Sequence, residues 1–442
     1  MASHDVNGTP AKRLREHVAM AVLVPPATEQ IDYADLYARW ERGNWSATEI
    51  DFTQDRIDWH KRFTPEQRRG ALWLYTLFFH GEDSVADNLS PYIDAAPLEE
   101  QKYFLATQQV DEARHAVFFH RFLHEVVGVG DGTLSGGLRA TAPELTWGHG
   151  KTFGRLDRMA DELRKDHSPR MLAKAITMYH VVVEGTLAQP GQHIIESSLD
   201  QLDLLPGFRE GMRNVAIDEQ RHIAFGVKLL SDLYSADPHG TQEAIVDVIR
   251  EMVPYVLSVP IPPGWDESYT TCFGYTLEDL FEEGARANEA RLRAVGLPLD
   301  DIHHFPFPMD ITPRERGKQA LILLRAGLLG ERNGPVGRDP HTVRVFMDLL
   351  ARNARGGEVA PGTTIQWEFS DLDPWYLLLE GDAKKTAIQG RVPKPTVRLR
   401  MRWDDFGELV SQRAEPYQLA LRGRMRPWGD PRLLLKLQRL FH

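Results

Sequence analysis

The sequence has very little cysteine and no long apolar run. Cys272 is the single cysteine among 442 residues, which excludes an internal disulfide framework and a cysteine-based metal site and favours a reducing, cytoplasmic compartment. No stretch approaches the ~18 consecutive apolar residues of a membrane-spanning helix, so we expect no stable membrane insertion. Acidic residues outnumber basic ones, and the net charge of −11 argues against a nucleic-acid partner.

The N-terminal part of the chain differs from the part that follows. Residues 1–43 begin with a basic stretch and a short apolar stretch that Pro25 and Pro26 interrupt. This is too short for a signal peptide, and we expect a flexible arm. From Thr64 to about Leu257 the sequence predicts four long helices, with almost none of the apolar–polar alternation that is typical of strands.

These helices predict an all-α domain over residues 44–300. Gly185 and Pro190 lie within the third helix and predict a kink or a bulge there. Proline and glycine then become frequent, and we expect a linker over residues 301–335. Residues 336–442 contain short β-rich segments separated by turn residues, which predicts a separate α+β domain and a multidomain chain.

Two copies of one motif indicate the chemistry. "DEARH" spans Asp111–His115 and "DEQRH" spans Asp218–His222. In each copy Glu and His are three residues apart, so both side chains leave the helix on one face. Apolar residues share that face, and a buried carboxylate is costly unless it is paired or binds a metal.

Two further acidic residues, Glu82 and Glu184, lie within apolar helical segments. One Glu from each of two helices and Glu-x-x-His from each of two others form the ligand set of carboxylate-bridged di-iron and di-manganese centres. Oxygen and imidazole ligands suit Fe and Mn, and six protein ligands leave positions open for O2 or substrate. The predicted ligands are Glu82, Glu112, His115, Glu184, Glu219 and His222.

Each of these residues alone has a simpler interpretation. Glu82 could be a solvated helix residue, with Asp83 beside it as the ligand instead. Glu184 could pair with Arg114 or Arg221, and the histidines could be hydrogen-bonded residues of the core. The six residues together, in this order on four helices, favour the metal centre.

The sequence around these residues resembles the small subunit of class I ribonucleotide reductase. The lead-in to its first metal-ligand helix matches "WSATEIDFTQDRIDW", and its four ligand helices match "GEDSV", "DEARH", "YHVVVEG" and "DEQRH". That subunit has a ferritin-like fold. The similarity spans about Asn44 to Leu257 and is closest to the ligand-binding oxidases of the group. It implies that the six predicted residues bind the metals and that Glu112 bridges them. It also implies a homodimer and an electron donor of unknown identity.

Two differences favour the oxidase over the reductase subunit. Phe119 stands where the reductase usually has its radical tyrosine, and the chain ends "LLKLQRLFH" without the tyrosine-and-acid tail. The oxidases form an ether cross-link between a valine and a tyrosine near the metals, and Val85 and Tyr179 occupy the matching positions. Core packing is the simpler interpretation of both residues.

The resemblance also assigns an electron-transfer line. Trp45, Asp218 and His115 match a line that both subfamilies have. Asp218 is suited to accept a hydrogen bond from a metal-bound histidine. The implied cofactor is a Mn/Fe or Fe/Fe centre that activates O2 and attacks unactivated C–H bonds, with a long-chain fatty acid held at the metals.

The C-terminal part resembles a second family. "IQWEFSDLDPWYLLLEGD", "AIQGRVPKPTVRLRMRWDDFGELV" and "YQLALRGRMRPWGDPRLLLKLQRLF" are similar to the sterol carrier protein 2 fold, which implies a lipid-binding domain with an apolar tunnel. Leu434, Leu437, Leu440 and Phe441 could line such a tunnel or belong to an ordinary core.

The leading hypothesis is a di-metal oxidase or oxygenase with O2 as co-substrate and a hydrophobic small-molecule or acyl ligand. One alternative is a ribonucleotide reductase small subunit that generates a radical. Another is a non-enzymatic lipid carrier whose metal site is structural. The fusion of the two domains suggests that the second presents a hydrophobic substrate to the metal site.

Overall fold

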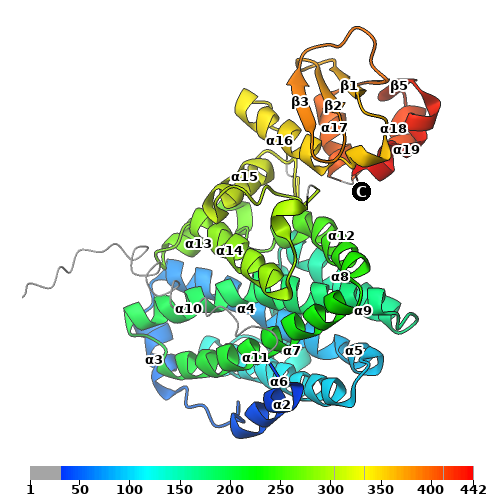
Figure 1. Ribbon diagram of the computed structural model, residues 1–442. Coiled ribbons are helices and arrows are strands. Elements are labelled where there is room, and N and C mark those ends of the chain that lie inside the picture. The colour runs from blue at the N-terminus through cyan, green and yellow to red at the C-terminus, as the bar shows by residue number, and fades with distance from the viewer. Residues whose placement is uncertain (1–30, 303, 333, 412, 442) are drawn as a thin grey trace, which may run out of the picture. The chain divides into compact units, whose positions relative to one another are not determined.

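The computed structural model describes residues 31–302, 304–332, 334–411 and 413–441. The chain divides into two compact units, with the boundary between Leu297 and Pro298. Within the described residues the first unit is helical, and all strands lie in the second (Figure 1). No helix in this part of the chain is both long and apolar enough to cross a bilayer.

In its described part the first unit consists of α-helices, two π-helical segments and short 3₁₀ helices, joined by turns and loops. The α-helices are α2 (Tyr33–Arg42), α3 (Thr53–Lys61), α4 (Pro65–Asn88), α5 (Ser90–Ala95), α6 (Glu99–Phe122), α7 (Leu134–Thr141), α8 (Trp147–Leu163), α9 (Pro169–Ile176), α10 (Gln189–Leu202), α11 (Pro206–Ala236), α12 (Pro238–Val256), α13 (Ser268–Thr271) and α14 (Leu277–Val295). The π-helical segments are η2 (Leu123–Val127) and η4 (Thr177–Ala188). Helix α4 packs along α6, and α11 packs against both α6 and η4. The four segments that carry the predicted ligands therefore surround one core.

Local sequence explains where the first ligand helix begins. Thr64 accepts a hydrogen bond from the Gln67 backbone N–H at 3.2 Å, and the Gln67 side chain accepts one from the Thr64 N–H at 3.0 Å. This reciprocal capping satisfies two N–H groups at the helix end. Pro65 follows in the first turn, where its missing N–H costs nothing.

The bulge predicted in the third long helix is present as η4. A Cβ on Gly185 would lie 2.5 Å from the Arg291 side chain and 2.9 Å from the His180 carbonyl oxygen, so only glycine fits there. Pro190 lies in the first turn of α10, just after the π-helical segment η4 ends. A π-helical turn rotates the residues that follow it relative to a regular helix, and Glu184 lies within this segment.

The expected N-terminal arm, residues 1–43, differs from the structure in its last part. Residues 1–30 lie outside the described residues, but helix α2 begins after Asp32, whose side chain accepts from the Ala34 N–H. Tyr33 and Leu36 are buried, and α2 packs on α6. Burial of one apolar face stabilises this short helix, which the charged sequence around it did not indicate.

The second unit has a five-stranded sheet in the order β3-β2-β1-β4-β5. Its strands are β1 (Thr363–Phe369), β2 (Trp375–Leu379), β3 (Lys385–Gln389), β4 (Val397–Met401) and β5 (Met425–Gly429). Strand β1 pairs with β4 in parallel, and the other pairs are antiparallel. The helices of this unit are α15 (Pro313–Arg325), α16 (Pro340–Asn353), α17 (Trp403–Val410), α18 (Pro416–Leu421) and α19 (Pro431–Phe441).

Helix α15 occupies part of the segment expected to be a linker, residues 301–335. Its N-terminus is capped by Thr312 and Glu315, and Leu321 and Leu324 are buried. A capped helix with a buried apolar face is a packed element and not a flexible connection.

The C-terminal apolar residues belong to the core of the second unit. Leu440 is fully buried, and Leu434, Leu437 and Phe441 pack against the buried cluster around Trp367. Of the two interpretations of these residues, the packing supports the ordinary core.

Candidate metal centre

Four segments bring six buried side chains together in the first unit. Ligand atoms of Glu82, Glu112, His115 and Glu219 lie within 4.8 Å of one another, and so do those of Glu112, Glu184, Glu219 and His222. These are the six residues predicted from the sequence. Asp83, the alternative to Glu82, is only partly buried and belongs to neither group.

The two histidines direct the same ring atom at the carboxylates. Nδ1 of His115 lies 3.3 Å from Glu82 Oε2 and 3.4 Å from Glu112 Oε2. Nδ1 of His222 lies 3.2 Å from Glu112 Oε1 and 3.6 Å from Glu184 Oε1. Glu112 therefore lies between the two histidines, with one oxygen towards each.

Burial and mutual charge perturb the pKa of every group in the cluster. Burial raises the pKa of Glu82 to about 8 and raises that of Glu184 well above its ordinary value. Burial also acts on Glu112, but the neighbouring imidazoles, His222 foremost, hold its pKa well below the usual range. Burial opposes protonation of His115 and His222, but the carboxylates raise both pKa values well above normal. Without metal ions, the groups whose pKa values are raised therefore keep their protons.

The cluster contains carboxylate oxygens that have no hydrogen-bond partner, as expected of a site that binds metal ions. Oε2 of Glu184 and Oε2 of Glu219 are buried and have no hydrogen-bond partner. A buried carboxylate oxygen without a donor costs free energy unless a cation binds it. Carboxylate oxygens and imidazole nitrogens are ligands that Fe and Mn accept, so the residues present suit a two-ion centre.

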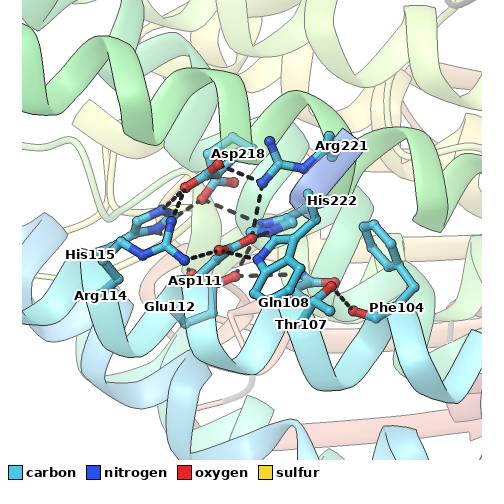
Figure 2. A network of polar contacts seen from close by, with 12 residues as sticks. Phe104, Thr107, Gln108, Asp111, Glu112, Arg114, His115, Asp218, Arg221 and His222 are labelled. Carbon is cyan, nitrogen blue, oxygen red and sulfur yellow. Dashed lines mark hydrogen bonds and ion pairs between the residues drawn. The ribbon is translucent and has the colours of Figure 1, made fainter. Parts of the chain in front are cut away.

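The Asp and Arg residues of the two motifs form an outer layer behind the histidines. Arg221 donates to Asp218 at 2.5 Å and to Asp111 at 3.1 Å, and so bridges the two aspartates (Figure 2). Arg114 lies 3.0 Å from Asp111 and 3.7 Å from Asp218. Both arginines therefore pair with aspartates and not with Glu184, which was the alternative left open by the sequence.

Each aspartate contacts the histidine of the other motif. Nε2 of His115 lies 3.2 Å from Asp218 Oδ2, which also accepts from the Trp45 indole N–H at 2.8 Å. We call these three residues the Trp45 line. Burial acts against ionisation of Asp218, but the hydrogen bond from His115 and nearby charges lower its pKa. Trp45 itself lines an open surface depression, so this line connects the cluster with the surface.

The residues named for the cross-link are both buried. Tyr179 donates its O–H to Glu112 Oε1 at 2.8 Å, which holds the phenol at the cluster. Val85 lies on α4 three residues after Glu82 and is buried. Phe119 stacks on Phe78 with ring centroids 5.7 Å apart.

Besides Asp111, sequence reasoning missed Gln108, which contacts the cluster, and His180, which contacts Gln108. Gln108 donates to Glu184 Oε1 at 2.7 Å, and its own oxygen lies 3.1 Å from His180 Nε2. Burial lowers the pKa of His180 to about 3, so the ring is neutral and Nε2–H donates to Gln108. The signal for Gln108 was present, because it lies one helical turn before Glu112 on the same face. His180 adjoins Tyr179 and had no comparable signal.

The chain is similar to two protein families and to solved structures. The model of the ribonucleotide reductase small chain matches residues 26–259, and the SCP-2 sterol transfer family matches residues 349–442. A variant of an R2-like ligand-binding oxidase with an anaerobically reconstituted Mn/Fe cofactor is 26% identical, with a TM-score of 0.51, over 60% of this chain and 94% of that chain. An R2-like ligand-binding oxidase from Sulfolobus acidocaldarius is 26% identical, with a TM-score of 0.51, over 64% of this chain and 93% of that chain.

These matches confirm the predicted pair of families, the fold class and the kind of cofactor. The first of these solved relatives carries a Mn/Fe cofactor, and the buried cluster can hold two metal ions. The protein is a di-metal oxidoreductase with a ferritin-like first unit and a C-terminal SCP-2 domain. Because the small-chain model covers more than half of the 442 residues, the chain belongs to the ribonucleotide reductase small chain family.

Proposed function

We propose that the centre activates O2 to oxidise a hydrophobic, acyl-type substrate, with Mn/Fe or Fe/Fe as the metal pair. The proposed ligands are Glu82, Glu112, His115, Glu184, Glu219 and His222. The observation that carries the proposal is the convergence of Glu184 and Glu219 with the Nδ1 atoms of both histidines, while Oε2 of each of these two glutamates is buried without a hydrogen-bond partner. Two divalent ions would balance the four carboxylates.

The surrounding residues have separate tasks in this proposal. When bound, the ions supply electrons and Lewis acidity to O2 at open coordination positions. Glu112, whose two oxygens face His115 and His222, would help to hold both ions. Asp218 accepts from Nε2 of His115, so that Nδ1 presents its lone pair to the cluster. Phe104 packs beside His222 with centroids 6.3 Å apart and helps to exclude water from that side.

We also propose the ether cross-link between Val85 and Tyr179. Its formation breaks the Tyr179 O–H bond and one C–H bond of Val85 and makes one C–O bond. The two electrons and two protons go to O2. The hydrogen bond from Tyr179 to Glu112 supports this assignment, because it holds the phenol oxygen next to the reacting centre.

Radical generation for a ribonucleotide reductase is the second candidate function. The family match fits both functions. Phe119 lies in an aromatic cluster with Phe78 and Phe208, and phenylalanine has no phenol to store a radical. We therefore favour the oxidase.

The SCP-2 domain supports a hydrophobic substrate. We propose that it supplies an acyl compound to the oxidase unit, that the chain forms a homodimer, and that a separate protein donates electrons. Light scattering on the purified full chain tests the dimer.

The decisive experiment loads the full chain anaerobically with Mn(II) and Fe(II) and then admits air, with and without long-chain acyl compounds. Expected results are O2 consumption, an oxidised acyl product, and loss of two hydrogen atoms in linked peptides that contain Val85 and Tyr179. The Tyr179→Phe variant should lose the linked peptides. Full metal occupancy without O2 consumption would contradict the oxidase and favour a carrier with a structural metal site.

A further inference from the structure

A second tryptophan lies behind the other half of the centre. The indole N–H of Trp40 donates to Asp111 Oδ1 at 2.8 Å, and Asp111 Oδ2 lies 3.1 Å from Nε2 of His222. We call these three residues the Trp40 line. Its contacts match those of the Trp45 line, which are 2.8 and 3.2 Å. The sequence motifs did not indicate this line, because Trp40 lies in the segment expected to be a flexible arm.

The surface end of the Trp40 line is also aromatic. Trp40 is partly buried, and the ring of Tyr37, one turn earlier on α2, lies 6.0 Å from it between centroids. Tyr37 is partly buried as well. Oxidisable rings thus extend from the Asp111 carboxylate to the protein surface.

We propose that Trp40 is a second redox-active site. It passes one electron through Asp111 and His222 to the half of the centre that contains His222. The inference rests on the proposed metal site. In the step, the Trp40 indole loses one electron to the oxidised centre and its Nε1–H proton moves to Asp111 Oδ1. An external one-electron donor, such as ascorbate or a reduced iron–sulfur protein, then restores the indole, and the proton returns.

Electron balance explains why a second line is useful. Reduction of O2 to water takes four electrons and four protons. The two reduced ions supply two electrons. In the first reaction the Val85–Tyr179 cross-link would supply the other two, and in every later reaction without a substrate these two must come from a donor, one at a time. Two separate lines, one behind each histidine, would deliver one electron to each half of the site.

The outer layer favours oxidation of this indole. Arg221 and Arg114 contact Asp111 at 3.1 and 3.0 Å, which fixes its carboxylate in place. A fixed carboxylate that accepts from the indole N–H stabilises positive charge on the ring and can take its proton.

Trp40 could instead be only an anchor for α2, so the test needs a redox signal. Helix α2 has other anchors, since Tyr33 donates to Asp232 at 2.6 Å and Leu36 is buried. The Trp40→Phe variant should therefore fold and bind metal. Trp147 is a matched control, because it is also partly buried beside a tyrosine, 5.7 Å from Tyr255 between centroids.

The experiment uses the full chain loaded with Fe(II), alone or with Mn(II), exposed once to O2 so that the cross-link has formed, reduced again without air, and then mixed with O2 without substrate. Freeze-quenched samples of protein with natural and ring-deuterated tryptophan are measured by electron paramagnetic resonance. We expect the spectrum of a tryptophan radical in the wild-type chain. The signal should be weaker in the Trp40→Phe variant and unchanged in the Trp147→Phe variant. We also expect Trp40→Phe to slow reduction of the oxidised centre by ascorbate by about an order of magnitude, with unchanged metal content.

The outcomes separate this inference from the proposed function. If the wild-type chain binds no metal or does not react with O2, the proposed function fails. If it reacts and Trp40→Phe matches Trp147→Phe in radical yield and reduction rate, the Trp40 line is refuted. Should Trp40→Phe not fold, peptide mapping of wild-type protein after repeated substrate-free turnover decides. Oxygen added at Trp40 or Tyr37 supports the line, and modification at Trp45 alone overturns it.

Discussion

Metal binding should release several protons, because the cluster without ions keeps protons on its ligand atoms. Carboxylates raise the pKa values of His115 and His222 well above normal, so both rings are protonated at neutral pH. Burial raises the pKa of Glu82 to about 8 and raises that of Glu184 well above its usual value. Metal ligands must be deprotonated, so filling the site at neutral pH should release about four protons. The logarithm of the overall binding constant should then rise by about four per pH unit in this range.

An anaerobic titration with Fe(II) at constant pH measures this release directly. The Glu82→Gln variant should release about one proton fewer and should bind the ion of that half more weakly. The matched Asp83→Asn variant should behave as wild type, since Asp83 lies outside both groups of ligand atoms. Release of one proton or none at full occupancy would refute the reasoning, because the ligands would already be ionised.

Three further predictions follow from the same contacts. Asp218→Asn removes the charge that His115 and Arg221 contact, and should weaken metal binding about 10- to 100-fold in a chelator competition; Asp232→Asn on the same helix is the control. Tyr179→Phe should bind both ions but show no loss of hydrogen by mass spectrometry after exposure to O2. The metal-free protein should lose stability as pH rises from about 6.5 to 8, by about 1.4 kcal/mol per pH unit for each proton that Glu82 and the two histidines hold only in the folded state; denaturant unfolding at several pH values measures this, and stability that rises with pH would contradict it.

Helical spacing predicted the ligand groups because it is a local property. Glu112 and His115 are three residues apart, and that spacing places both on one helix face whatever else the chain does. The partners of Asp111 and Arg114 could not be predicted in this way. Each contacts the other motif, more than a hundred positions away, and only the packing of α6 against α11 sets those pairs.

The elements that sequence reasoning missed are stabilised by tertiary packing. Strand β5 has one buried residue, Met425, and four exposed ones, so it lacks the alternation that predicts a strand. Its pairing with β4 defines it. Helix α2 is similar, since the burial of Tyr33 and Leu36 depends on the surface of other helices.

The charges of the centre are arranged in two layers. In the outer layer Asp111 and Asp218 face Arg114 and Arg221, so two negative charges meet two positive ones and the layer is neutral without a metal. In the inner layer four glutamates surround two imidazoles, and the arginines are not available to them. When the protons leave, the inner layer carries four negative charges, and two divalent ions match that number. The repeated D-E-x-R-H motif thus encodes both layers, since Glu and His face the centre of the cluster while Asp and Arg hold the opposite helix in register.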